Sequence, residues 1–266
     1  MISNFSIGQY YPIKSPLHRL DPRTKISAVF FFIIALFFAH DYYSYFVAIL
    51  FSLLLIFLSR VPIKILLRGL KPIFIFVIIT AFIHLFFTPG TEIWRWKILK
   101  LTKEGLDQAI FMSIRLILLI GVSSLLTLTT TPVSLTDGME RLLGPFKKIG
   151  LPAHELAMMM TIALRFIPTL LEETEKIMKA QVSRGANFSS GSLLKRAKVL
   201  VPLLVPLFIS AFKRAEELAL AMEARGYHGG EGRTRMRVLV MKWFDWISLG
   251  VIMLFLAYMG YYRWLA

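Results

Sequence analysis

The chain has 266 residues, of which 56% are hydrophobic and 14% aromatic, with no cysteine and a formal net charge of +15. The lack of cysteine excludes disulfides, thiolate metal sites and cysteine nucleophiles, and the apolar content exceeds that of most soluble domains. Several runs approach the roughly 20 apolar residues that cross a bilayer, so we predict an all-α polytopic membrane protein. The basic residues then indicate the positive-inside bias and contact with membrane lipid, and we expect no nucleic acid partner.

Residues 1–131 are predicted to hold a polar N-terminal segment and four membrane spans. Asp21 as N-cap, with Pro22 at the first helical position and Arg23 after it, marks the first helix start. The spans are predicted at about 26–39, 44–58, 72–88 and 107–131. A basic loop at 59–71 separates the second and third spans. The alternating residues 91–106 indicate an interfacial hairpin.

Residues 132–242 differ in character, because they carry 17 of the 31 basic residues. We predict a short helix at about 134–148, then long helices from about Pro152 to Arg184 and from about Ser192 to Arg225. Pro168 is a candidate kink in the first long helix. The apolar stretches 156–171 and 199–212 resemble spans, but Arg165 interrupts the first and two prolines the second. We therefore predict a cytosolic helical coupling domain, and one last span of about 243–264 within residues 243–266, which gives about five spans.

The two long helices end in the same way, at Ser183-Arg184-Gly185 and at Ala224-Arg225-Gly226, with the arginines 41 residues apart. Glycine commonly follows a helix and a cation complements the helix dipole, so capping alone explains one such ending. Weaker matches at the same offset, such as Glu175 with Glu216, indicate a helical repeat. A guanidinium on a rigid helix end is also a good anchor for a carboxylate or carbonyl, and we favour docking to a partner.

The sequence shows few signs of an active site. The sequence has neither a phosphate-binding loop of the Gly-x-x-x-x-Gly-Lys type nor a His-Glu-x-x-His zinc motif. Glu172, Glu173 and Glu175 are interpreted as a solvated helix face. Arg115 lies about two turns inside the fourth predicted span, where it either extends to the outer interface or fixes helix packing. Asp107 and Glu104 are its candidate partners.

The chain resembles a known family, the transmembrane T component of energy-coupling factor (ECF) transporters, over nearly its whole length. The resemblance rests on residues 15–25, residues 126–132, the run Leu164-Arg165-Phe166-Ile167-Pro168 and the two Arg-Gly endings. It implies a complex with two ABC-type ATPase subunits and one substrate-binding S component in a prokaryotic cytoplasmic membrane, for vitamin or trace-metal uptake.

Further expectations follow from the resemblance. The N-terminus and the coupling domain would be cytoplasmic, and Arg184 and Arg225 would each insert into one ATPase. The chain would not be an enzyme and would need no cofactor or metal of its own, because the partner subunits bind the ATP. Two alternatives come from other classes: a self-sufficient carrier or channel, with polar residues in several spans, and an interfacial enzyme acting on a lipid phosphate.

Overall fold

A computed structural model describes residues 10–96, 99–150, 152–186, 193–229 and 239–265. The chain divides into two compact units. The bundle unit comprises Gly8–Leu142 and Val238–Ala266, so its last helix comes from the far end of the sequence. The crossed-helix unit includes Leu143–Arg237. The described part of the chain is almost entirely helical, which confirms the predicted fold class.

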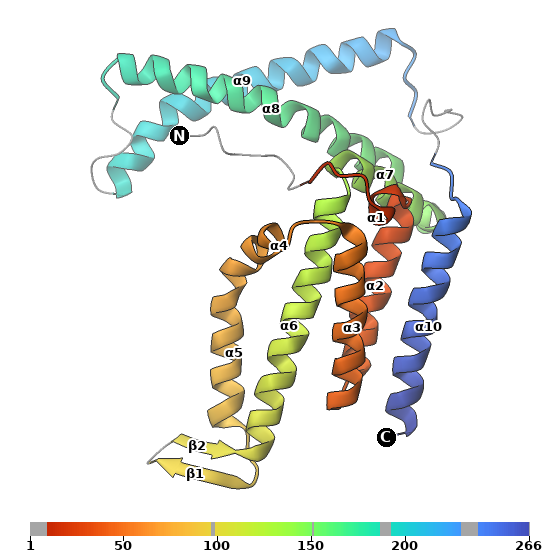
Figure 1. The fold of residues 1–266 in the computed structure, drawn as a ribbon. Coiled ribbons are helices and arrows are strands. Elements are labelled where there is room, and N and C mark those ends of the chain that lie inside the picture. Colours follow the sequence, from red (N-terminus) through yellow and green to blue (C-terminus); the bar gives the residue numbers. More distant parts are fainter. Residues whose placement is uncertain (1–9, 97–98, 151, 187–192, 230–238, 266) are drawn as a thin grey trace. The chain divides into compact units, whose positions relative to one another are not determined.

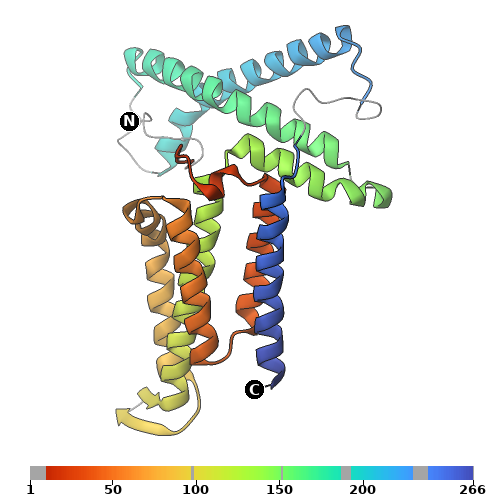
Figure 2. The same ribbon diagram turned by 45° about the vertical axis from the view of Figure 1, so that its right-hand side comes forward.

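The long helices of the bundle unit run side by side (Figures 1 and 2). One segment differs from the prediction, because the loop 59–71 contains a short helix. The hairpin predicted within 91–106 is confirmed as two antiparallel strands, and the next helix starts at Lys103. Lys97 and Ile98 of that hairpin lie outside the described residues. The elements are α1 (Pro16–Arg19), α2 (Pro22–Phe38), α3 (Tyr42–Ser59), α4 (Ile63–Leu70), η1 (Lys71–Ile73), α5 (Phe74–Phe87), β1 (Glu92–Trp96), β2 (Leu99–Thr102), α6 (Lys103–Thr129), α7 (Pro132–Leu143) and α10 (Trp243–Leu265).

Among the described helices, four are long and apolar enough to cross a membrane: α3, α6, α10 and α8 (Ala153–Ser183). The pair α4 and α5, bent by 59° at its break, would make a fifth. Helix α2 has 17 residues and is therefore about 26 Å long, slightly less than the hydrocarbon core of a bilayer. These helices confirm a polytopic membrane protein.

The core of the bundle unit lies where α2, α3, α6 and α10 meet. The rings of Phe32, Phe51 and Phe255 stack there, with centroid distances of 4.4–6.0 Å. Helix α5, by contrast, leaves most of its large apolar side chains exposed, including Phe74 at 62% and Phe87 at 71%. A helix that is apolar on all sides needs little protein cover when lipid surrounds it.

The crossed-helix unit consists of η2 (Gly144–Ile149), α8 and α9 (Leu193–Ala224). The predicted helix at 134–148 is therefore two elements, because α7 ends at Leu143 and a 3-10 helix follows it. Helix α8 continues through Pro168, and α9 continues through Pro202 and Pro206. The expected start of the second long helix at Ser192 lies outside the described residues. Figures 1 and 2 both show α8 and α9 crossing each other.

Candidate functional site

The ends of α8 and α9 share one backbone geometry. At the end of α8, the N–H of Gly185 donates to Val182 O at 2.9 Å and the N–H of Ala186 donates to Gln181 O at 3.0 Å. At the end of α9, Gly226 and Tyr227 donate to Glu223 O and Met222 O at 2.9 and 3.0 Å. Both patterns are the Schellman motif, whose C′ residue adopts a left-handed conformation. Gly185 and Gly226 supply it, with φ of 87° and 70°.

In each motif the arginine is the C-cap residue, so its position relative to the helix is fixed by the hydrogen bonds that follow it. Arg184 and Arg225 are both exposed. Neither guanidinium forms a hydrogen bond or ion pair with another described residue. Ser183 and Ala224 are exposed beside them, and the Ser183 hydroxyl donates to Lys179 O within its own helix at 3.1 Å. The geometry thus presents two equivalent cations to the surroundings.

Helices α8 and α9 are joined at equivalent positions of the repeat. Arg214 Nη2 lies 3.1 Å from Glu173 Oε2, and the two residues are separated by 41 positions, the same offset that separates the arginines. Arg184 follows Glu173 by 11 residues, and Arg225 follows Arg214 by 11 residues. Each arginine therefore lies beyond the ion pair by about 16 Å of α-helix. The interpretation of Glu173 as part of a solvated face missed this contact, which joins two residues of different helices.

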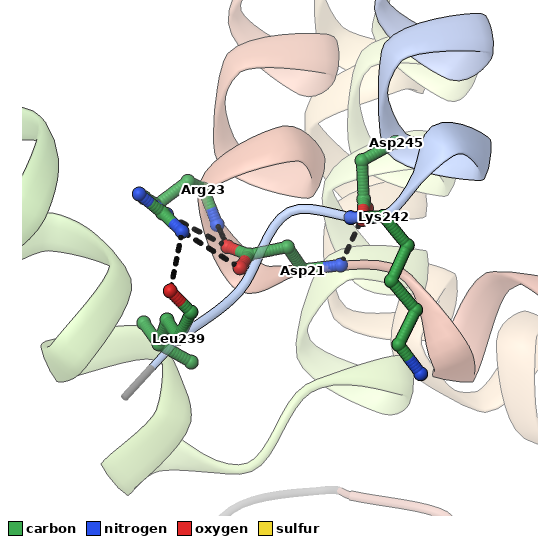
Figure 3. Close-up of polar contacts among 5 residues, drawn as sticks. All are labelled: Asp21, Arg23, Leu239, Lys242 and Asp245. Carbon is green, nitrogen blue, oxygen red and sulfur yellow. Dashed lines mark hydrogen bonds and ion pairs between the residues drawn. The ribbon is translucent and has the colours of Figure 1, made fainter. Parts of the chain in front are cut away.

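A second polar cluster joins the starts of α2 and α10 within the bundle unit (Figure 3). Asp21 is the N-cap of α2, as predicted, and accepts from Arg23 N at 2.9 Å; Pro22 follows it at the first helical position. Its carboxylate also accepts from Arg23 Nε and Nη2, and Nη2 donates to Leu239 O at 3.1 Å.

Asp245 completes this cluster from α10. Its carboxylate accepts from the backbone N–H of Asp21 at 2.7 Å and from that of Lys242 at 2.8 Å. Asp245 is 2% exposed and Asp21 is 7% exposed, so both residues are buried, and both carboxylates are hydrogen-bonded. The sequence prediction did not include Asp245, and no local motif could have linked it to a residue 224 positions away.

The chain is similar to known proteins over nearly its whole length. Residues 13–236 match the family described as CbiQ, cobalt transport protein. The energy-coupling factor transporter transmembrane protein EcfT of Acidaminococcus fermentans is 55% identical over 264 residues, which cover 99% of this chain and 98% of that protein. The EcfT proteins of Heliobacterium modesticaldum and Bacillus subtilis are 58% identical over 246 residues and 54% identical over 241 residues, covering 92% and 90% of this chain, and 92% and 91% of those proteins, respectively. The chain belongs to the EcfT family.

EcfT membership confirms the resemblance to the T component of ECF transporters. The matched residues belong to both the bundle unit and the crossed-helix unit, and they include both Arg-Gly endings. Within the described ranges, no three His, Cys, Asp or Glu side chains form a group able to hold a metal ion.

In this EcfT family member, Arg115 lies inside the bundle unit and contacts the end of α2. Its Nη2 donates to Ala39 O at 3.0 Å, and its guanidinium carbon lies 5.5 Å from the centre of the Phe37 ring and 5.9 Å from that of Tyr45. From α10, Arg263 Nη1 donates to Phe37 O at 3.0 Å. Two arginines therefore satisfy carbonyls at the C-terminal end of α2, which have no partner within the helix.

The prediction that Asp107 and Glu104 pair with Arg115 is wrong. Glu104 instead accepts from Thr91 N at 2.7 Å, and Asp107 accepts from the Tyr42 hydroxyl. Glu104 thereby joins α6 to the residues before β1, whereas Arg115 donates to Ala39 O and to Met112 Sδ. Arg165 and Pro168 are exposed on α8, more than three turns before Arg184, so the structure does not gather them with the tip residues.

Proposed function

We propose that this chain is the energy-coupling subunit of an ECF-type ABC importer. It transmits the ATP-driven motion of two ATPase subunits to one substrate-binding S component, for uptake of a vitamin or trace metal. ATP is bound by the partner subunits, and the chain itself is neither an enzyme nor a cofactor-binding protein. The observation that carries this proposal is the pair of identical helix ends, each with an exposed arginine 11 residues beyond the contact that joins the helices.

In this proposal, Arg184 and Arg225 each insert into a groove of one ATPase. Two equal arms suit two equivalent sites, because a pair of similar subunits related by a two-fold axis presents the same groove twice. The planar guanidinium forms bidentate hydrogen bonds with carboxylates, which makes it a specific anchor. The Schellman motifs hold each arginine at the end of a stiff helix, so a displacement of the ATPase moves the whole helix.

Helix α9 also offers a surface for the S component. Its first half exposes Leu200, Leu204 and Phe208 along one row, and Val201, Val205 and Ile209 along the next. Residues spaced by four positions lie on one helix face, so these rows form a continuous apolar stripe. A membrane-embedded partner would cover this stripe without the desolvation that charged side chains require.

The proposal places the N-terminus and both arginine tips on the cytoplasmic side of a prokaryotic cytoplasmic membrane. Because the sequence has no cysteine, single cysteines can report this directly. In Ser183→Cys and Ala224→Cys variants, a membrane-impermeant maleimide added to inside-out vesicles should label both positions. Labelling of the two cysteines from opposite sides of the membrane would contradict the proposal.

Charge reversal of both arginines tests the docking itself. We expect Arg184→Glu/Arg225→Glu to lose ATPase binding, or to hydrolyse ATP without driving uptake, in a complex reconstituted with its ATPases and S component. Lys179→Glu/Lys213→Glu is the matched control, since it reverses two other exposed cations of the same helices.

The control double variant should assemble, hydrolyse ATP and transport as the wild type does. Unchanged assembly, ATPase rate and uptake in Arg184→Glu/Arg225→Glu would disprove docking through the arginines. Uptake by this chain alone in liposomes would instead support a self-sufficient carrier.

A further inference from the structure

The bundle unit contains an apolar slot of about 320 Å³ between α2, α3, α6 and α10. Its inner wall is buried: Phe32 is 1% exposed, Ile252 3% and Val122 4%. The rim of the slot is exposed, since Leu54 on α3 is 52% exposed and Val251 on α10 is 46% exposed. The slot therefore opens sideways between α3 and α10, toward the surroundings of the bundle.

The shape of the slot follows the helices. Along α2 it is lined by residues spaced as one helix face, from Lys25 through Ala28 to Phe32, a distance of about 10 Å. The lining residues of this elongated slot are almost all apolar. A narrow, flexible alkyl chain lying parallel to the helices fits such a lining.

One end of the slot is polar because Lys25 lines it. Lys25 is 7% exposed, and its ammonium group donates to Thr129 O at 2.9 Å and to Thr130 Oγ1 at 3.3 Å. An ammonium group has three donors, so one of them remains for a further acceptor. The carboxylates nearby are otherwise engaged, since Asp21 accepts from Arg23 and Asp245 accepts from two backbone N–H groups.

A ligand that fits the whole slot therefore needs two groups: an alkyl chain along the apolar walls and an anionic oxygen at Lys25. A membrane phospholipid has both, and the side opening gives it a route from the bilayer. We propose that the slot binds one acyl chain of an anionic phospholipid, with the lipid phosphate beside the Lys25 ammonium group.

Native mass spectrometry of the full chain in detergent micelles, with added 1-palmitoyl-2-oleoyl phosphatidylglycerol, tests the site. We expect one phospholipid to stay bound to the wild type and to be lost when Ala28→Phe fills the slot. Ser248→Phe, at the rim, provides a second filling variant that disturbs the core less. Leu254→Phe is the matched control on α10, because Leu254 is 72% exposed and does not line the slot.

The role of Lys25 is tested by Lys25→Met, which keeps an apolar stem and removes the charge. A lost charged hydrogen bond should weaken phosphatidylglycerol binding by about ten-fold. Palmitic acid as a competing probe distinguishes a phospholipid from a free fatty acid, since the fatty acid should not displace phosphatidylglycerol at equal concentration.

The occupant in native membranes is identified by a photo-crosslinking residue at position 54. We expect an adduct with the mass of one phospholipid. A protein adduct at that position would overturn the proposal. So would retention of lipid by folded Ala28→Phe and Ser248→Phe proteins at the wild-type level.

Discussion

Glu173 and Arg214 contact each other at 3.1 Å while occupying the same position in two repeats 41 residues apart. The ion pair therefore joins α8 and α9 at equivalent positions of the repeat. Each arginine tip follows the ion-pair residue of its own helix by the same 11 residues.

The ion pair should contribute modestly to stability, because the two side chains are 25% and 37% exposed. In a double-mutant cycle of Glu173→Ala and Arg214→Ala, we expect a coupling energy of about 0.5–1 kcal/mol in the free energy of unfolding. The measurement is chemical unfolding of the purified chain. A control cycle of Glu223→Ala with Arg214→Ala should give a coupling energy near zero, because Glu223 is exposed and nine residues away from Arg214 on α9.

Gly185 and Gly226 adopt a left-handed conformation, so adding a side chain at either position should reduce stability. Gly185→Ala and Gly226→Ala should each reduce the free energy of unfolding by about 1 kcal/mol, because a Cβ is disfavoured at positive φ. Each variant should also weaken ATPase binding in a pull-down assay, since the arginine beside it loses its fixed position. Gly144→Ala is the control, as Gly144 lies in η2 without a positive φ. Equal behaviour of all three variants would contradict this account.

Removal of the Asp245 carboxylate should destabilise the bundle unit strongly. Asp245→Ala leaves the buried backbone N–H of Asp21 without an acceptor, at about 1–3 kcal/mol, and also removes the part-buried hydrogen bond from Lys242 N. Asp245→Asn keeps one carbonyl oxygen, so its thermal stability should lie between that of Asp245→Ala and that of the wild type. Thermal unfolding in detergent measures the order of the three proteins. An Asp245→Ala protein as stable as the wild type would disprove the proposed link between α2 and α10.

Loss of Arg115 should loosen the C-terminal end of α2. Arg115→Met removes the donor to Ala39 O and the contacts with two aromatic rings, and we expect a loss of about 2 kcal/mol. Hydrogen exchange followed by mass spectrometry should show faster exchange in the last turn of α2 and unchanged exchange in its first turn. Arg115→Lys should restore part of the protection, because its ammonium group can still donate to the carbonyl.

Acid should destabilise the segment before α2 through His18. Burial lowers the pKa of His18 below its usual 6.5, while its Nε2 donates to Tyr11 O at 3.0 Å. The folded state therefore holds this imidazole neutral, whereas the unfolded chain takes up a proton as the pH falls below about 6.5. The free energy of unfolding should decrease as the pH falls from 6.5 toward the folded-state pKa. His18→Asn should flatten this dependence.

The sequence predicted those parts of the fold that local chemistry determines. Asp21 with Pro22 marked the start of α2, and the Arg-Gly endings marked the ends of α8 and α9, because caps depend on residues a few positions apart.

Other features depend on contacts between distant segments and could not be predicted from the sequence. Asp245 binds Asp21, and Arg115 binds a backbone carbonyl that has no sequence signature. The face of α5 that contacts α6 was equally hidden, because nearly every residue of α5 is apolar and no periodic pattern separates its faces.

The attachment of α2 at both ends implies an order of assembly. The backbone N–H of Asp21 is satisfied by Asp245, 224 residues later, and the carbonyl of Phe37 by Arg263, 226 residues later. Chains are synthesised from the N-terminus, so the first span leaves the ribosome long before the helix that completes its hydrogen bonds. The bundle can close only in the last moments of translation, and a chain truncated before Asp245 would leave its first span unfinished in the membrane.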